Sequence, residues 1–128
     1  MNLIGASLSL VKPGVVEITL PFRADLGQQD GYLHAGILTT IADSASGYAA
    51  YSLMPPDSSV LSVEFKVNLL RPAHGVGFVA SAEVIKAGRT LTVVRADVFG
   101  LDDKGDRTLV ATMLSTMICL RNQARSGR

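Results

Sequence analysis

The sequence has very little of several features that mark specialised classes of protein. Its 128 residues include no tryptophan and one cysteine, Cys119, so an internal disulfide is excluded. A lone cysteine in an apolar run fits a buried thiol in a reducing compartment. The chain has no run of about eighteen apolar residues that would span a membrane, and no basic segment followed by an apolar one that would mark a signal peptide. We therefore expect a cytoplasmic protein that does not cross a membrane.

Charge is sparse as well. Charged residues make up 18% of the chain and the formal net charge is +1, with Lys and Arg scattered along the sequence. Nucleic-acid binders carry a clustered basic surface, so this balance gives no case for nucleic acid as a partner. Hydrophobic residues reach 48%, which fits one compact domain with a single core. We expect that domain to cover residues 1–120, followed by a flexible tail over residues 121–128.

Alternation of apolar and polar residues predicts six β-strands. In the clearest strand the odd positions from Leu61 to Leu69 are apolar and the even positions from Ser62 to Asn68 are polar, so Ser62 is expected on the polar face. Short turns join the later strands, which predicts an antiparallel meander. The predicted strands cover residues 4–11, 15–22, 60–70, 76–86, 90–99 and 108–120.

Between the second and third strands the hydrophobic period changes to that of a helix. Apolar residues recur at helical spacing from Ala35 to about Leu53, and Pro55 then ends the pattern. Four alanines make this helix slim, so a sheet can pack closely around it. One helix among six strands predicts an α+β fold, with an antiparallel six-stranded sheet wrapped around one long central helix.

Asp43 lies in the middle of this apolar helix. A carboxylate in such a place costs several kcal/mol unless it is paired or neutralised, so a functional role is the first explanation to test. His34 precedes it by nine residues, at the expected start of the helix. The alternative is a structural acid that bonds a loop amide where two chains meet.

Two segments carry a resemblance to a known family. The string His34-Ala35-Gly36-Ile37-Leu38-Thr39-Thr40-Ile41-Ala42-Asp43, followed by the strand and turn at residues 61–73, resembles the hotdog-fold thioesterases, in particular the phenylacetate-pathway (PaaI-like) group. The order of elements matches over nearly the whole chain. The resemblance implies hydrolysis of an acyl-coenzyme A thioester, with coenzyme A as part of the substrate and with no metal or redox cofactor.

The resemblance also implies roles for individual residues. Asp43 matches the acid that acts as nucleophile or general base, and the backbone N–H of Ala35 matches the donor that polarises the thioester carbonyl. Gln28 occupies the position of a side-chain amide six residues before the histidine, and Ser62 that of an assisting hydroxyl on the next strand.

Physical chemistry supports the backbone part of this site independently. The first turn of a helix offers unpaired N–H donors and a favourable dipole to a developing oxyanion. Ala35 and Gly36 are small, so a carbonyl can approach both closely. His34 is expected either to touch substrate or to bond the backbone near the helix start, where Asp30 is an alternative cap. Gly88 and Arg89 are expected to contact coenzyme A, with Arg89 meeting a phosphate.

The spacing within the helix limits what one chain can do. Ala35 and Asp43 are eight residues apart, roughly 12 Å along a helix, which is too far for both to touch one thioester group. Two antiparallel helices across a two-fold axis would bring Asp43 of one chain beside Ala35 and Gln28 of the other. We therefore expect a homodimer with two shared sites, and members of this family often pair further into tetramers.

Two other functions remain open at this level. A hotdog hydratase or dehydratase would act on the acyl chain beyond the carbonyl, and a non-catalytic acyl-CoA-binding protein would keep the fold without the chemistry. Ser62 is as well explained by a cross-strand hydrogen bond as by catalysis. The sequence does not identify the acyl group.

Overall fold

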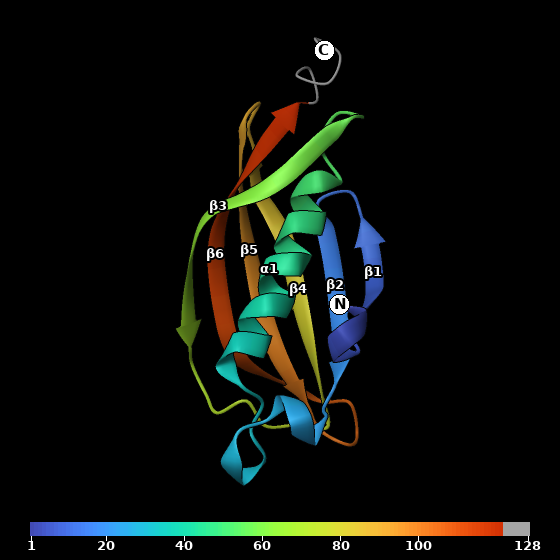
Figure 1. The fold of residues 1–128 in the computed structure, drawn as a ribbon, viewed down its shortest axis with the longest axis vertical. Helices are drawn as coiled ribbons and strands as arrows, with labels where there is room; N and C mark the ends of the chain where they lie inside the picture. The colour runs from blue at the N-terminus through green and yellow to red at the C-terminus, as the bar shows by residue number, and fades with distance from the viewer. Residues whose placement is uncertain (122–128) are drawn as a thin grey trace.

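The computed structural model describes residues 1–121, which form one curved sheet around a single long helix (Figure 1). The expected α+β class and the wrapped-helix arrangement are confirmed. No helix in this part of the chain is long and apolar enough to cross a membrane. The elements are the 3-10 turns η1 (Asn2–Ile4), η2 (Ala24–Leu26) and η3 (Gln29–Gly31), the helix α1 (Ala35–Tyr51), and the strands β1 (Ser7–Lys12), β2 (Val15–Pro21), β3 (Ser58–Leu69), β4 (Gly77–Ala87), β5 (Leu91–Leu101) and β6 (Arg107–Arg121).

The strand order corrects the expected meander. All neighbours are antiparallel and the order is β1-β2-β4-β5-β6-β3, so β3 pairs with β6 at the edge while β2 pairs with β4. Hydrophobic alternation sets which residues form strands but carries no information about which strands pair. The ends of the strands differ by a few residues, most clearly in the first strand, which was predicted from residue 4 but begins at Ser7, since Ile4 belongs to η1. The strand β6 includes Arg121, and the rest of the expected tail lies outside the described residues.

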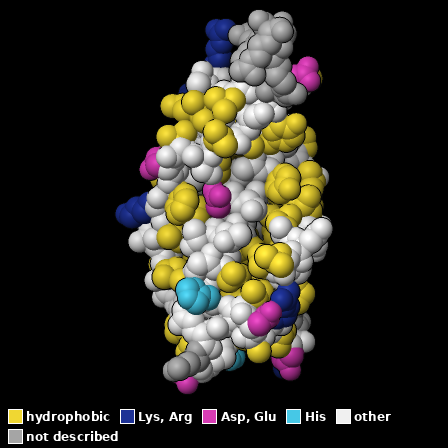
Figure 2. Space-filling view, viewed as in Figure 1, with side chains coloured by type: hydrophobic (Ala, Val, Ile, Leu, Met, Phe, Trp, Pro, Cys, Tyr) yellow, Lys and Arg dark blue, Asp and Glu magenta, His cyan; other side chains and the backbone are white. Residues whose placement is uncertain are grey.

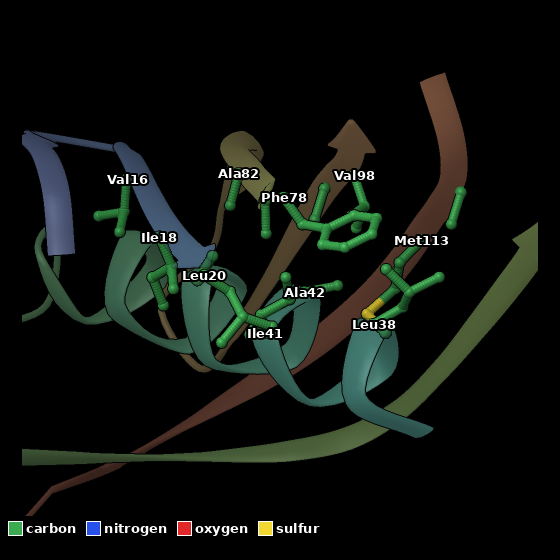
Figure 3. Packing of buried hydrophobic residues seen from close by; sticks show 14 of the residues in the cluster. Val16, Ile18, Leu20, Leu38, Ile41, Ala42, Phe78, Ala82, Val98 and Met113 are labelled. Atoms are coloured by element: carbon green, nitrogen blue, oxygen red, sulfur yellow. The ribbon is translucent and has the colours of Figure 1, made fainter. Parts of the chain in front are cut away.

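The core lies between α1 and the concave face of the sheet. Figure 3 shows Leu38, Ile41 and Ala42 of the helix facing Phe78, Val98 and other side chains of the strands. The alanines make the close approach possible, since they remove the bulk that would hold helix and sheet apart. Those buried on α1 are Ala42, Ala45, Ala49 and Ala50. The opposite face of the helix is therefore left for other contacts.

The helix begins at a histidine cap. His34 is the N-cap residue, with extended φ and ψ of −64° and 136°, and its Nδ1 accepts a hydrogen bond from the Gly36 N–H at 3.2 Å. His34 therefore bonds the backbone at the helix start, as one of its two expected roles requires. Asp30 does not cap the helix, contrary to the alternative considered for it, because it lies in η3 with a φ of 71°. A neutral imidazole accepting at Nδ1 carries its proton on Nε2.

The loop before the helix is held by local contacts. Arg23 forms an ion pair with Asp25 at 2.6 Å, and their hydrogen bond lowers the pKa of Asp25 below its usual value. The Gln28 N–H donates to the Tyr32 carbonyl at 2.6 Å. These contacts fix the loop that carries Gln28 close to the start of α1.

Candidate active site

Asp43 lies half-buried on the side of α1 that faces away from the core. The Ser62 hydroxyl of β3 donates a hydrogen bond of 2.6 Å to its Oδ1 and lies 3.3 Å from the Met117 sulfur. Both Asp43 and Ser62 line a cavity of about 590 Å³ between the helix and the edge strand. The carboxylate is therefore oriented through one oxygen and open to a cavity through the other.

A β-bulge turns Ser62 toward Asp43 and corrects the face predicted for this residue. The pairing of β3 with β6 shifts between Ser62 and Glu64, which leaves Val63 as the extra residue. Ser62 is the partner of Met117, which is 1% exposed in the core, and Glu64 is the partner of Thr116 on the next position. One inserted residue exchanges the two faces of a strand. Ser62 therefore faces the helix, not the polar side that strict alternation predicts.

The rest of the cavity comes mainly from one helix face and one strand. Tyr48 is 45% exposed and Tyr51 is 47% exposed, so both present rings at the surface of this cavity. Asp43, Gly47 and Tyr51 follow one another at spacings of four residues, and Tyr48 lies three residues before Tyr51, so they share one side of α1, and this spacing is the signal that identifies them. The further lining residues are Ser44, Gly47, Val60, Leu61 and Met117.

Ala35 and Gln28 lie in a different cavity. This second space, of about 450 Å³, lies at the start of the helix, and none of its lining residues belongs to the Asp43 cavity. The Ala35 N–H has no acceptor among residues 1–121. Leu38, Leu69, Leu70 and Arg71 also line the second cavity. The four residues expected to be catalytic thus form two pairs that do not meet within one chain.

Gly36 differs from Ala35 in what its N–H does. Because His34 Nδ1 accepts the Gly36 N–H, this donor is occupied, whereas the Ala35 N–H remains available. Of the two donors expected to hold an oxyanion, the geometry leaves Ala35. His34 and Gly36 are both exposed at the helix start and line neither of the two cavities.

Gly88 and Arg89 lie in a third cavity, of about 300 Å³, at the end of the molecule where α1 terminates. Cys119 also lines it and is 8% exposed, in agreement with a buried thiol. In the described part of the chain no group of three or more His, Cys, Asp or Glu residues is arranged to hold a metal ion. The residues assigned to coenzyme A are thus separate from the helix start that carries Ala35.

Several known proteins are similar to this chain in fold and in sequence. Residues 30–106 match the thioesterase superfamily. A thioesterase family protein from Silicibacter pomeroyi is 48% identical and has a TM-score of 0.92, with 95% of this chain and 89% of that chain covered. A 1,4-dihydroxy-2-naphthoyl-CoA hydrolase from Listeria monocytogenes is 29% identical, with 70% of this chain and 73% of the relative covered.

A more distant structure shares the fold. A mutant of the phenylacetic acid degradation protein PaaI from Thermus thermophilus is 24% identical and has a TM-score of 0.79, with 92% of this chain and 96% of that chain covered. The match over residues 30–106 includes the helix with Asp43 and the strand with Ser62. With the hotdog arrangement of helix and sheet, these similarities confirm the resemblance found in the sequence: this chain belongs to the thioesterase superfamily.

Proposed function

We propose that this protein hydrolyses an acyl-coenzyme A thioester to the free acid and coenzyme A. The observation that carries the proposal is the Asp43 carboxylate, held by Ser62 through Oδ1 at 2.6 Å in the wall of an open cavity. A carboxylate with one oxygen fixed and the other open is suited to take a proton from water or to attack a carbonyl carbon. Membership of the thioesterase superfamily supports a thioester as the substrate.

The site requires two chains. Ala35 and Asp43 are separated by about 12 Å of helix and line different cavities, so the oxyanion donor and the carboxylate come together when a second copy supplies one of them. The strand β3 pairs with β6 on one side and exposes apolar residues, among them Leu61 at 57% and Leu69 at 55%. Unpaired edge strands favour pairing with another strand. A homodimer joined across this edge and the adjacent helix faces is the arrangement that completes both sites.

Hydrolysis then proceeds through a tetrahedral intermediate. Asp43 accepts a proton from water as the water oxygen attacks the thioester carbon, and the Ala35 N–H of the second chain donates to the developing oxyanion. Collapse of the tetrahedral intermediate breaks the C–S bond, and the departing thiolate takes up the proton. If Asp43 attacks directly, a mixed anhydride with Asp43 forms as the C–S bond breaks and coenzyme A departs as a thiolate that takes up a proton, and water then cleaves the anhydride to the free acid and the Asp43 carboxylate. Gln28 lies in the cavity with Ala35 and is assigned to hold the carbonyl or the water.

The test is a panel of aromatic, short-chain and long-chain acyl-CoAs, with a thiol reagent to detect released coenzyme A. We expect turnover of at least one ester, and a decrease in kcat of about 10²–10⁴-fold in Asp43→Asn because a general base contributes about that much. Asp57→Asn is the matched control, since Asp57 is an exposed acid with a positive φ of 64° that asparagine also adopts. Equal turnover by wild type and Asp43→Asn would show that Asp43 is not the catalytic acid, and no turnover of any ester would favour a non-catalytic acyl-binding protein.

A further inference from the structure

Two arginines without partners line one cavity. Four of the arginines in residues 1–121 have a carboxylate or carbonyl as a partner: Arg23 with Asp25, Arg95 with Asp97, Arg107 with Glu17 and Arg71 with the Leu109 carbonyl. The side chains of Arg89 and Arg121 have no hydrogen bond or ion pair to any described residue, and both residues line the cavity at the end of α1. Among the described residues no acidic side chain lines this cavity. The pair therefore forms an open cationic pocket.

This cationic pocket adjoins the Asp43 cavity. Val60 of the Asp43 cavity is the cross-strand partner of Cys119, and Met117 is that of Thr92, while Cys119 and Thr92 line the cationic pocket. The β4–β5 hairpin, the end of β6 and the last turn of α1 meet at this end of the molecule, opposite the start of the helix (Figure 1). The two cavities thus follow one another along the second half of α1.

The span between them matches a chemical length. From Asp43 to Tyr51, the last residue of α1, eight residues of helix rise about 12 Å, and Leu53, which lines the cationic pocket, follows two residues later. The pantetheine arm between a thioester and the coenzyme A diphosphate has a backbone about as long as four or five extended residues, roughly 15 Å. Tyr48 and Tyr51 lie on this path with exposed rings and hydroxyls, which suit an arm that alternates amides with apolar groups.

Hydrophobic side chains flank this path. Figure 2 shows hydrophobic side chains on both sides of the helix, with basic side chains at the ends and edge of the view. The cationic pocket lies at the carboxyl end of α1, where the helix dipole disfavours an anion. Two guanidinium groups outweigh the partial negative charge there, since guanidinium binds phosphate oxygens through charge-assisted and often bidentate hydrogen bonds.

We infer that Arg89 and Arg121 together bind the phosphate groups of coenzyme A, and that the pantetheine arm lies along the last two turns of α1 on the same chain that supplies Asp43. The inference rests on the proposed thioesterase function and adds Arg121, the direction of the arm and the chain that holds it. The acyl group of the bound substrate then extends from Asp43 in the opposite direction, toward the cavity of the second chain that contains Ala35 and Leu69.

The experiment compares two thioesters of one acyl group in the full-length protein, one with coenzyme A and one with N-acetylcysteamine, which has no phosphate. We expect Arg89→Gln and Arg121→Gln each to raise KM for the coenzyme A ester about tenfold, with a larger increase in the double variant and with kcat retained. The kinetics of the N-acetylcysteamine ester should not change. Arg95→Gln, which removes an arginine already paired with Asp97, is the matched control and should leave both esters unaffected.

Direct binding separates this inference from the proposed function. Titration calorimetry with adenosine 3′,5′-bisphosphate, which lacks a thioester, should show binding to wild type that weakens with added salt. The affinity should fall about tenfold in each arginine variant. An equal rise in KM for both esters, no change for either, or unaltered bisphosphate binding in the variants would overturn the inference. So would a fall in melting temperature as the sole effect, since that outcome assigns the arginines to the helix dipole. If no thioester is hydrolysed, the bisphosphate titration still decides.

Discussion

Replacing Ala35 with proline removes one N–H from the proposed oxyanion site and little else. Ala35 is the first residue of α1, where proline is favoured because its fixed φ suits the helix and no intrahelical hydrogen bond is lost. The residue before it, His34, already has an extended ψ of 136°, which the position before a proline requires. The variant should therefore fold with the wild-type stability or slightly above it.

The effect on catalysis should be large because the first turn of the helix offers no second free backbone donor. The Gly36 N–H is occupied by His34 Nδ1 at 3.2 Å, so it cannot replace the lost group without breaking the helix cap. Removal of one oxyanion donor in a preorganised site costs about 10²–10³ in kcat, or about 2.7–4 kcal/mol. We expect Ala35→Pro to lose that much in kcat with little change in KM.

The assay measures kcat and KM with the best acyl-CoA of the panel, together with the melting temperature. Ala35→Ser, which keeps the N–H and adds a small side chain, is the matched control and should remain active. If Ala35→Pro is folded and retains kcat within about threefold, Ala35 is not the oxyanion donor and the reasoning from its unpaired N–H is refuted.

The same variant tests whether the site is shared between chains. In a mixed dimer of Ala35→Pro and Asp43→Asn chains, one site collects both substitutions and the other is intact. Random exchange of equal amounts makes half of the dimers mixed, so two inactive proteins should regain about a quarter of the wild-type activity. Activity that stays at the level of the separate variants, in dimers shown to have exchanged, would place both residues in a site within one chain.

Two further predictions concern Ser62 and the packing of the sheet. Ser62→Ala should lower kcat about 10–100-fold, because a hydrogen bond to a charged group contributes about 1.5–3 kcal/mol, whereas Ser62→Thr should retain most activity; equal loss in both variants would assign Ser62 to packing. Gly100→Ala should destabilise the fold by about 2–3 kcal/mol, since a Cβ added to Gly100 in β5 would collide with the His74 carbonyl. Thermal unfolding measures this against Gly47→Ala, where nothing lies within 4 Å of the added Cβ and helix propensity gains about 1 kcal/mol. An unchanged melting temperature for Gly100→Ala would contradict the prediction.

Local patterns in the sequence predicted much of the fold and part of the site. The helix from Ala35 and the six strands follow from periods of 3.6 and 2, which depend on neighbours along the chain. The resemblance around His34 and Asp43 placed the chain in its family, and the match over residues 30–106 confirmed it. The histidine cap was one of two local alternatives for His34, and the hydrogen bond from the Gly36 N–H shows that this cap forms.

The tertiary structure decided what depends on residues far apart in the chain. Strand order is one such property, because the pairing of β3 with β6 is a contact between distant segments that alternation does not encode. The face of Ser62 is another, since a bulge at Val63 appears in the sequence as an ordinary alternating residue and becomes visible in the register with β6. The grouping of Arg89 with Arg121 likewise requires the folded chain.

The sequence by itself determined the class of fold and the family and singled out Asp43 as the candidate catalytic acid, because these follow from local periodicity and a contiguous motif. The helical rise also predicts that Ala35 and Asp43, if they form one site, belong to different chains. Only the tertiary structure divided the candidate residues among three cavities and left the Ala35 N–H as the free donor. The physical reason is that cavities and hydrogen-bond partners arise from packing between elements, which no single stretch of sequence specifies.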